Sequence, residues 1–374
     1  MPTFDIVRIA TPTESFRVKS VMGQYDLQES NTTERFVGSI DLPEQWNIGL
    51  IVGRSGSGKT TIARELFGDC IVSGFDYTHD NILDDMPSGV SVKDITRILT
   101  AVGFSSPPSW MKPYNVLSNG EKMRCDIARA ILENREMFVF DEFTSVVDRT
   151  VARVASLAIQ KAIRRQQSRF IAVTCHYDVQ KWLMPDWVFN TDDMTFQRLD
   201  VETQKKNRPE LRIDIYETTR KEYYWNVFRK HHYLSHSFNK AARVFIATCN
   251  GMLCGFCAVL PFPHPYKRNT WKGHRTVVFP DFQGVGIGSA FTDYIAQMFA
   301  DEGKTYISTT SNPAMIFARA HSPKWRTTRI GRMGRGSKNG LIQNSGVRGS
   351  TSANRITVSF EFIPKRKPKS ENNG

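Results

Sequence analysis

Short apolar runs separated by helix-forming segments characterise the first 200 residues of the chain. Residues Ile62–Leu66 and Ile127–Ile131 are good helix formers and are predicted to be helical. Buried strands are predicted at the apolar runs Gly49–Val52, Met137–Phe140, Ile171–Thr174 and Asp186–Asn190. This pattern indicates an α/β domain over residues 1–200.

The pattern changes beyond residue 200. A polar run over residues 201–211 is predicted to be a linker. After it, the dipeptide Asn250-Gly251 between two apolar runs predicts a β-hairpin. Strands are predicted at residues 212–217, 243–248, 252–260, 276–279, 305–310 and 355–363, and helices at residues 222–233, 290–300 and 313–320. We therefore expect an α+β domain with a mixed sheet at residues 212–363, followed by a basic tail at residues 364–374.

Charge is distributed unevenly between the two halves. Residues 1–200 contain 22 Lys and Arg against 26 Asp and Glu, whereas residues 201–374 contain 28 against 11. The second half thus has a net charge of +17, which favours binding to a polyanion such as nucleic acid. A basic surface that serves solubility alone is the alternative.

Composition also bears on where the protein works. The sequence has no run of 18 apolar residues, and its N-terminus lacks the basic and apolar regions of a secretory signal. Six cysteines in 374 residues do not resemble a secreted disulfide framework. We expect a cytoplasmic protein with reduced thiols that does not contact a membrane.

A glycine-rich loop follows the first predicted strand. Residues Gly53–Thr60 match the phosphate-binding pattern GxxxxGK[ST]. Backbone N–H groups of such a loop surround phosphates where side chains are absent, as at Gly56 and Gly58. Lys59 is expected to bridge the β- and γ-phosphates of ATP, and the Thr60 hydroxyl to bind Mg²⁺. The residues expected to contact ATP here are Gly53, Ser55, Gly56, Ser57, Gly58, Lys59, Thr60 and Thr61.

Later segments follow the order found in ABC ATPases. The run LSNGE at residues 117–121 resembles the ABC signature LSGGQ, which implies ATP contacts for Ser118, Gly120 and Glu121. The strand before Asp141 and Glu142 resembles a Walker B element. By this resemblance Asp141 holds Mg²⁺ and Glu142 polarises the attacking water.

Two more segments extend the resemblance. Residues Ser145–Asp148 are similar to the D-loop, and Ile171–His176 is similar to the strand that ends in the switch histidine. The resemblance implies that Glu142, Asp148 and His176 are catalytic. It also implies a P-loop NTPase fold of the ABC type and a homodimer, because the signature of one copy completes the ATP site of the other.

The segment between Lys59 and Ser118 departs from the ABC pattern. It is shorter than the helical subdomain of transporter ATPases, and it contains no glutamine, so the Q-loop residue is missing. Asp80 and Asn81 are the candidate substitutes. A short helical subdomain leaves little surface for a membrane-spanning partner, which argues against transport.

A second glycine-rich loop lies in the basic half. Residues Gln283–Gly288 (QGVGIG) stand between a predicted strand and a predicted helix and are similar to motif A of GNAT acyltransferases, [QR]xxGx[GA]. Bare N–H groups at a helix N-terminus can bind the pyrophosphate of acetyl-CoA or a related acyl-CoA. The resemblance implies a GNAT fold and acyl-CoA contacts at Val277, Val278, Gln283, Gly284, Val285, Gly286, Ile287, Gly288, Ser289 and Asn312.

The chain departs from ordinary GNAT enzymes after Asn312. Those enzymes carry a tyrosine one to two turns later, as the general acid for the leaving thiolate, and this chain does not. Together with residues His231–Ser235, this arrangement resembles the Mom-type DNA-modifying acyltransferases of bacteriophages, which modify adenine. The resemblance implies that DNA is the acceptor.

Basic and aromatic residues surround the expected acceptor cleft. Lys324, Arg326 and Arg329 are expected to contact phosphates, while Trp325 stacks on a displaced base. Further basic residues are Arg332, Arg335 and those of the run at residues 365–369. A loop over the cleft is expected at residues 331–352. A solvated basic face with a frayed tail is the alternative.

The sequence leaves several candidates for the acid and the base of the acyl transfer. They are His232, Tyr233, His274 and Ser311. A zinc site at Cys249, Cys254 and Cys257 is less favoured than buried free thiols, because the hairpin is apolar and a fourth ligand is missing.

Three functions are compatible with the sequence. The first is an ABC ATPase fused to an acyl-CoA-dependent N-acyltransferase that modifies DNA. The second is the same enzyme with a protein amine or a small molecule as acceptor. The third is an ATP-switched DNA-binding protein without transferase activity.

Overall fold

The structure is a computed structural model that describes residues 3–10, 15–26, 32–207, 210–232, 238–264, 266–332 and 356–365. It consists of two compact units. The first contains residues 1–76, 87–90 and 125–209, and the second contains residues 77–86, 91–124 and 210–374. The units differ from the two predicted domains, because most of residues 77–124 pack with the second half of the chain.

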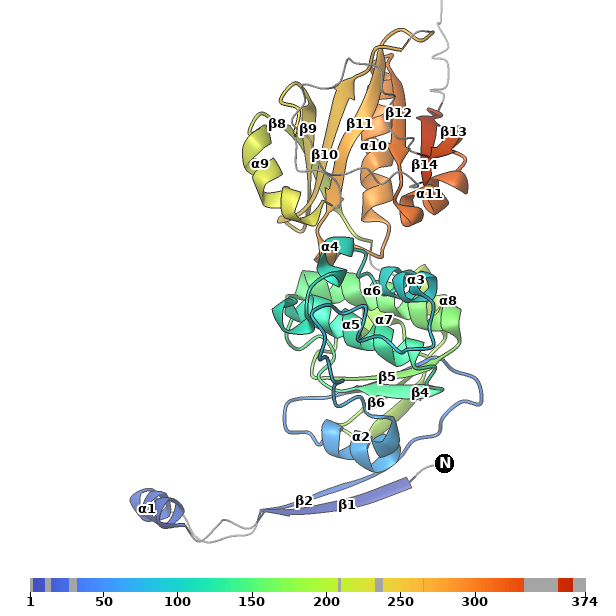
Figure 1. The fold of residues 1–374 in the computed structure, drawn as a ribbon. Helices are drawn as coiled ribbons and strands as arrows, with labels where there is room; N and C mark the ends of the chain where they lie inside the picture. The colour runs from blue at the N-terminus through green and yellow to red at the C-terminus, as the bar shows by residue number, and fades with distance from the viewer. Residues whose placement is uncertain are drawn as a thin grey trace, which may run out of the picture. The chain divides into compact units, whose positions relative to one another are not determined.

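The first unit is built on a sheet in the order β4–β5–β3–β6–β7. All neighbouring strands are parallel except β6 and β7. The strands are β3 (Ile48–Val52), β4 (Met137–Phe140), β5 (Arg169–Thr174), β6 (Trp187–Asn190) and β7 (Thr195–Arg198). Helix α2 (Lys59–Phe67) covers one face of the sheet, and α6 (Arg149–Gln166) covers the other (Figure 1). Since β3 is buried along its whole length, the predicted α/β fold of this unit is confirmed.

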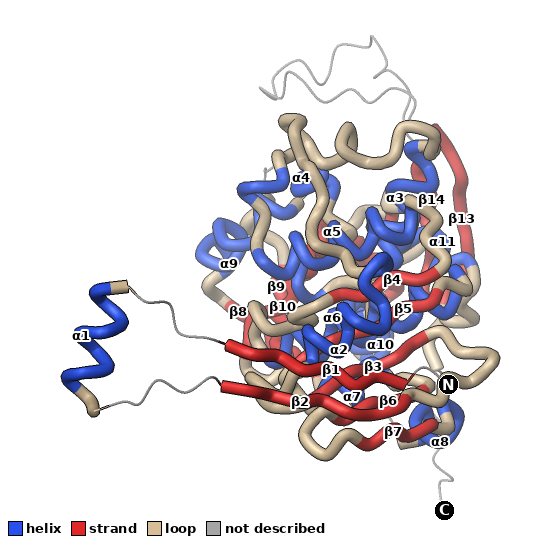
Figure 2. Tube along the Cα trace, turned by 90° about the horizontal axis from the view of Figure 1, so that it is seen from below, coloured by secondary structure: helices blue, strands red, loops and turns tan. Residues whose placement is uncertain are grey.

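An antiparallel pair that the sequence analysis did not predict adds to this core. Strand β1 (Thr3–Ala10) lies next to α2 and pairs with β2 (Thr32–Ser39) (Figure 2). In the sequence, the exposed helix α1 (Phe16–Gln24) stands between these two strands. The side chains of Phe4 on β1 and Phe36 on β2 are buried. They belong to the same hydrophobic core as Trp187.

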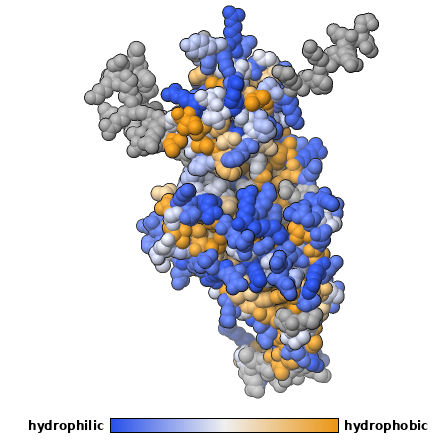
Figure 3. Space-filling view, turned by 90° about the vertical axis from the view of Figure 1, so that its right-hand side faces the viewer, coloured by the Kyte–Doolittle hydropathy of each residue, from blue (hydrophilic) through white to orange (hydrophobic). Residues whose placement is uncertain are grey.

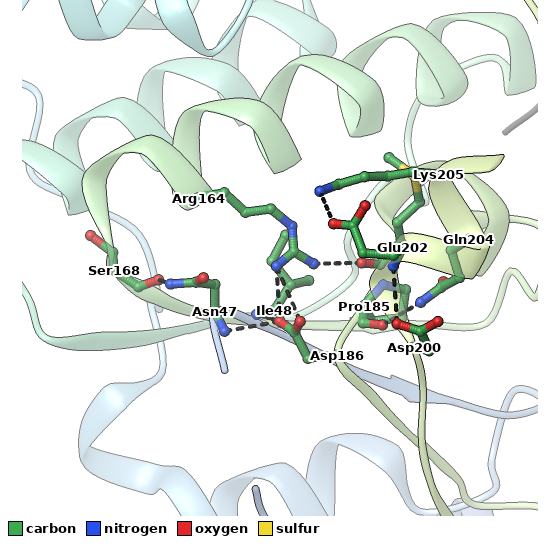
Figure 4. Close-up of polar contacts among 11 residues, drawn as sticks. Asn47, Ile48, Arg164, Ser168, Pro185, Asp186, Asp200, Glu202, Gln204 and Lys205 are labelled. Carbon is green, nitrogen blue, oxygen red and sulfur yellow. Dashed lines mark hydrogen bonds and ion pairs between the residues drawn. The ribbon is translucent and has the colours of Figure 1, made fainter. Parts of the chain in front are cut away.

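A polar network fixes the amino-terminal ends of the central strands (Figure 4). The Asp186 carboxylate accepts backbone N–H bonds from Asn47 (2.9 Å) and Ile48 (2.8 Å) and pairs with Arg164 of α6 at 3.1 Å. Gln204 donates to the Pro185 carbonyl at 2.9 Å. Gln204 belongs to α8 (Val201–Lys206), so the predicted linker begins with a helix that is bonded to the first unit.

The second unit contains a mixed sheet in the order β13–β14–β12–β11–β10–β9–β8. Its strands are β8 (Ile213–Thr218), β9 (Arg243–Cys249), β10 (Met252–Pro261), β11 (Thr270–Val278), β12 (Thr305–Thr310), β13 (Trp325–Arg332) and β14 (Ile356–Phe362). Asn250 and Gly251 both have positive φ, at +50° and +79°, which confirms the predicted tight turn between β9 and β10.

Helices of the second unit come from both halves of the chain. They are α3 (Val92–Ala101), α4 (Pro107–Trp110), α9 (Lys221–Phe228), α10 (Ile287–Asp301) and α11 (Pro313–Ala320), with short 3-10 helices η2 (Tyr114–Val116), η3 (Arg229–His231) and η4 (Pro280–Phe282). Helix α5 (Asn119–Leu132) begins in this unit and passes into the first unit after Arg124.

The parallel strands β11 and β12 are paired over a short stretch only. The paired residues are Thr270–Lys272 and Thr305–Ile307, although β11 continues to Val278. The pairing of β10 with β11 is also interrupted by a bulge at Ala258/Val259. The carboxyl-terminal part of β11 is therefore free of β12 where it leads into the second glycine-rich loop.

The surface carries mostly hydrophilic residues on the face seen in Figure 3, with apolar residues in separate patches. Among the described residues, no helix has the length and apolar character needed to cross a membrane.

Candidate functional site

The first glycine-rich loop has the backbone geometry that its sequence predicts. Gly56 and Gly58 have φ values of +83° and +85°, which L-residues rarely adopt. A Cβ atom on Gly58 would lie 2.5 Å from the Phe36 ring, whereas one on Gly56 would face open space. The loop is thus packed against the protein on one side and presents bare backbone on the other.

Polar side chains hold this loop in place. Lys59 is almost buried, and its Nζ donates to the Arg54 carbonyl at 2.6 Å. Ser57 Oγ donates to the same carbonyl at 2.8 Å. On the outer edge, Asp192 accepts the Arg54 backbone N–H at 2.9 Å and the Tyr177 hydroxyl. Residues that follow β5 and β6 therefore brace the loop that follows β3.

An open depression lies beside the loop, next to the first turn of α2. Its volume is about 400 Å³, and its lining residues are Arg8, Thr60, Thr61, Arg64 and Glu65. Arg8 Nη1 donates to Thr61 Oγ1 at 3.3 Å. This depression gives solvent access to Thr60, the expected Mg²⁺ ligand.

The residues predicted to be the Walker B pair and the switch histidine lie at the same edge of the sheet as the loop. β4, β5 and β3 are neighbouring parallel strands, so their carboxyl ends meet at one edge. Asp141 and Glu142 follow β4, and His176 follows β5. Glu142 has a φ of +55°, and its N–H donates to Asp141 Oδ1 at 2.9 Å. The structure therefore brings these three predicted residues together.

Electrostatics favour a neutral His176. Burial lowers the pKa of His176, and the positive charge of Arg149 lowers it further, against the opposing effects of Asp178 and Glu142. The Thr60 hydroxyl and the Asp141 carboxylate supply oxygen donors, which are the ligands that Mg²⁺ prefers. These residues fit the expected metal.

Asp148 has a structural role that the sequence analysis did not anticipate. Its side chain accepts the Thr150 N–H at 2.7 Å and caps α6. The catalytic role of Asp148 stays a prediction.

The signature residues form a capping box at the start of α5. The Ser118 N–H donates to Glu121 Oε2 at 3.0 Å, and the Glu121 N–H donates to Ser118 Oγ at 3.3 Å. These reciprocal bonds are a structural reason for the presence of glutamate at position 121. Ser118 and Asn119 are exposed, while Gly120 and Glu121 are buried. ATP contacts at Ser118, Gly120 and Glu121 stay predictions.

Of the two candidate Q-loop substitutes, Asn81 is committed to a local turn. Its side chain donates to Asp84 Oδ2 at 2.7 Å and accepts the Asp84 N–H at 3.0 Å. Nothing in the structure assigns Asp80 to the role.

The second glycine-rich loop repeats the geometry of the first. Gly284 and Gly286 have φ values of +86° and +94°, and Gly286 directly precedes α10. A Cβ atom on Gly286 would meet nothing within 4 Å. The first amide groups of a helix lack intrahelical partners, so the N-terminus of α10 can receive an anion there.

Two side chains expected to contact acyl-CoA are instead bonded within the protein. Gln283 Oε1 accepts the Ser105 N–H at 2.8 Å, and Gln283 Nε2 donates to the Val278 carbonyl at 2.8 Å. Asn312 caps α11 by accepting the Met315 N–H at 3.1 Å. Both side chains position the site in this conformation, and their direct contact with a ligand stays a prediction.

The sequence analysis missed a buried polar cluster where β11 and β12 diverge. Arg319 of α11 is 4% exposed, donates to Ser308 Oγ at 2.7 Å and lies 4.3 Å from the Trp325 ring. Tyr306 is buried beside it, and burial raises its pKa well above the usual value. The signal available in the sequence was Arg319, the single polar residue of the otherwise apolar run at residues 313–320.

The expectation that Trp325 stacks on a base is not compatible with the structure. Trp325 is 6% exposed, and its indole N–H donates to Asp293 Oδ1 at 2.7 Å. Lys324 pairs with the same carboxylate at 2.9 Å, and Arg326 pairs with Glu361 at 2.9 Å. The tryptophan belongs to the core because β13 pairs with β14 and turns it inward. Arg335, the run at residues 366–369 and residues 333–352 of the expected loop lie outside the described residues.

His274 is the best-defined of the acid–base candidates. Burial lowers its pKa to about 4, with smaller effects from Arg275 and Lys272, so the imidazole is neutral at pH 7. Its Nε2 is buried without a hydrogen-bond partner among the described residues. His232 is buried against Trp225, and Tyr233 lies outside the described residues.

The cysteines of the hairpin are buried free thiols, as expected. Burial raises the pKa of Cys254 to about 12 and that of Cys257 to about 11. In the part of the chain that the structure describes, no three His, Cys, Asp or Glu side chains are grouped so that they could hold a metal ion.

Comparison with known proteins finds similarity of two kinds. The family model of the acetyltransferase (GNAT) domain matches residues 240–321. The ATP-binding protein UgpC for sn-glycerol-3-phosphate import of Psychromonas ingrahamii is 27% identical over 177 residues, which are 38% of this chain and 47% of that protein. The chain combines an ABC ATPase-like domain with a GNAT acetyltransferase domain.

A second curated relative is the ATP-dependent lipid A-core flippase of Photobacterium profundum, 28% identical over 45% of this chain and 35% of its own length. The chain thus spans about half the length, or less, of these curated relatives.

Solved structures of both kinds are similar to this fold. The dimeric ATP-binding cassette MJ0796 bound to ADP and Pi is 16% identical, with a TM-score of 0.36 over 52% of this chain and 99% of that chain. A Bacillus subtilis acetyltransferase in complex with CoA is 18% identical, with a TM-score of 0.30 over 41% of this chain and 97% of that chain.

Proposed function

We propose that this chain is an acyl-CoA-dependent N-acyltransferase that is controlled by ATP binding and hydrolysis in its own ABC ATPase-like domain. The supporting observation is a pair of loops with the same backbone geometry. Each has two glycines at positive φ before a helix, Gly56 and Gly58 in one and Gly284 and Gly286 in the other. Such helix N-termini bind pyrophosphate groups, here those of ATP and of an acyl-CoA.

In the ATPase, the residues at the edge of the sheet divide the work. Lys59 neutralises the β- and γ-phosphates. Thr60 and Asp141 would hold Mg²⁺, which would supply charge neutralisation for the phosphates. Glu142 orients the attacking water and accepts its proton, and His176 contacts the γ-phosphate as a neutral donor.

The active ATPase is a homodimer in this proposal. Each chain has one P-loop and one signature, and ABC sites form between the P-loop of one copy and the signature of the other. Size-exclusion chromatography of a Glu142→Gln variant tests this. ATP-dependent dimers are expected, and a monomer at saturating ATP would reject the dimer.

In the transferase, an amine nitrogen of the acceptor attacks the thioester carbonyl carbon. A C–N bond forms, the C–S bond breaks, and the CoA thiolate leaves and takes up a proton. The amine proton passes to a base, for which His274 is our choice because it is neutral at pH 7 and lies on the strand that leads into the loop.

The acceptor in this proposal is a base amine of DNA, as in the Mom-type proteins. Two observations support a polyanion: the net charge of +17 over residues 201–374 and the exposure of Arg326 and Arg329 on β13. Lys324, Arg326 and Arg329 would bind phosphates, whereas Trp325 would not stack on a base.

Mass spectrometry of nucleosides from cells that express the intact chain tests the acceptor, with Gly286→Asp as the control. A new acylated nucleoside that depends on Gly286 is expected. Acylated protein amines or small molecules in its place would overturn the DNA acceptor and retain the transferase. The absence of any Gly286-dependent acylation would overturn the transferase itself.

A further inference from the structure

The second unit joins parts of the chain that belong to the two predicted activities. Residues 91–124, which we call the signature segment, end in the signature motif and the first residues of α5. They pack in one compact unit with residues 210–374, where α4 lies against η3. A segment of the ATPase is thus in contact with the transferase domain of the same chain.

Arg124 makes the central bonds of this contact. Its side chain is fully buried, with Nη1 3.1 Å from Asp281 Oδ1 and Nη2 3.1 Å from the Asp281 backbone carbonyl. A buried guanidinium is strongly destabilised when its partner is lost. Displacement of Arg124 therefore has to move Asp281 with it.

A second bond holds the residue that starts the loop. The Ser105 N–H donates to Gln283 Oε1, and Gln283 Nε2 donates to the Val278 carbonyl, both at 2.8 Å. Between the two anchored residues, Phe282 is buried. The loop with Gly284 and Gly286 follows directly, so the signature segment fixes its entry at two adjacent points.

The same helix connects this contact to the signature. Glu121 forms the capping box with Ser118, and Arg124 lies three residues further along α5. Residues three apart are neighbours on one face of a helix. A shift of the signature by one turn of helix is therefore transmitted to Arg124.

We propose that Arg124 and Ser105 couple the ATP state of the signature to the affinity of the second loop for acyl-CoA. This inference rests on the proposed function. ATP that contacts Ser118 and Gly120 fixes the start of α5. Arg124 of α5 then holds Asp281, and Ser105 of the same signature segment holds Gln283, in the conformation that exposes the N-terminus of α10. ATP strengthens acyl-CoA binding, and acyl-CoA strengthens ATP binding by the same factor, because such coupling is reciprocal.

Calorimetry on the intact chain tests the coupling. The background variant is Glu142→Gln, so that bound ATP is not hydrolysed, and the titrant is acetyl-CoA with and without saturating ATP and Mg²⁺. We expect ATP to lower the acetyl-CoA dissociation constant about fivefold or more, and acetyl-CoA to lower that of ATP equally.

Two conservative variants and one control locate the effect. Asp281→Asn retains an acceptor for Arg124 without the charge, and Arg124→Lys retains the charge without the two-pronged contact. Both are expected to bind each ligand alone and to lose the coupling. The control is Arg97→Ala, which removes an exposed ion pair with Asp94 on α3 and leaves the coupling intact.

The outcomes separate this inference from the proposed function. Unchanged coupling in both Asp281→Asn and Arg124→Lys overturns the inference, as does a parent protein that binds both ligands independently. In either case the proposed function stands. A parent protein that binds ATP but no acetyl-CoA overturns the proposed function and the inference with it.

Discussion

Replacing Gly286 and Gly288 separately by alanine distinguishes backbone strain from simple loss of a glycine. Gly286 has a φ of +94° and open space around its Cβ position, so Gly286→Ala introduces strain without a steric clash. Gly288 lies in the first turn of α10, and its Cβ would make an ordinary contact with Val278 at 3.5 Å. Gly288→Ala is therefore a matched control in the same loop.

The magnitude follows from the backbone angle. An L-residue in the left-handed region costs about 1–2 kcal/mol. If that strain shifts the loop away from its binding conformation, the apparent acetyl-CoA affinity falls by the fraction of competent protein, about 5- to 30-fold. The added methyl group also faces the space where the pyrophosphate is expected, so the loss is at least this large. At Gly288, alanine instead improves helix propensity by about 0.5–1 kcal/mol.

Calorimetry with acetyl-CoA measures the affinity of each variant, and urea denaturation measures its stability. We expect Gly286→Ala to bind weakly and Gly288→Ala to bind as the parent protein does, with equal or greater stability. Equal affinity for Gly286→Ala and the parent protein would refute the reasoning, because the positive φ would then have no part in the binding conformation.

Three further predictions concern other parts of the molecule. Glu142→Gln should lower steady-state phosphate release by about 10²- to 10⁴-fold, while ATP binding, measured by equilibrium dialysis, persists; unchanged turnover would assign the base elsewhere. Asp186→Asn should cost about 1.5–3 kcal/mol in urea unfolding, because it weakens charge-assisted bonds to Arg164 and two backbone N–H groups. Arg198→Ala, which removes an exposed ion pair with Asp41, should cost under about 1 kcal/mol. Equal losses of stability for Asp186→Asn and Arg198→Ala would contradict this ranking. His274 has a folded pKa near 4, below the unfolded value, so the folded state binds fewer protons and stability should fall as the pH drops from about 6.5 toward 4. His274→Gln should flatten that part of the pH profile, and an unaltered profile would exclude His274 as its source.

Local sequence was sufficient where the chemistry itself is local. A loop that binds phosphate needs glycine at particular backbone angles before a helix, and both loops show these angles at the predicted glycines. The hairpin at Asn250-Gly251, the strand at residues 305–310 and the helix at residues 313–320 also match their predicted positions, because turn residues and apolar periodicity act over a few neighbours.

Only the tertiary structure decided which side chains are free to meet a ligand. The sequence around Trp325 does not show whether its side chain is exposed or buried. The pairing of β13 with β14 and the hydrogen bond from the indole to Asp293 determine its burial. Gln283 likewise matches a binding motif, yet its amide is bonded to Ser105, 178 positions away. Such bonds depend on which segments pack together, and a single sequence carries no signal of them.

The division into units has the same origin. Motif order along the chain assigns residues 91–124 to the ATPase, and packing places them with the transferase, through a buried Arg124 that lies 157 positions from Asp281. The sequence determined the backbone geometry of the two glycine-rich loops, because that geometry depends on adjacent residues. The connection between them is decided by the fold, because desolvation of a guanidinium requires a partner that only three-dimensional packing can bring to it.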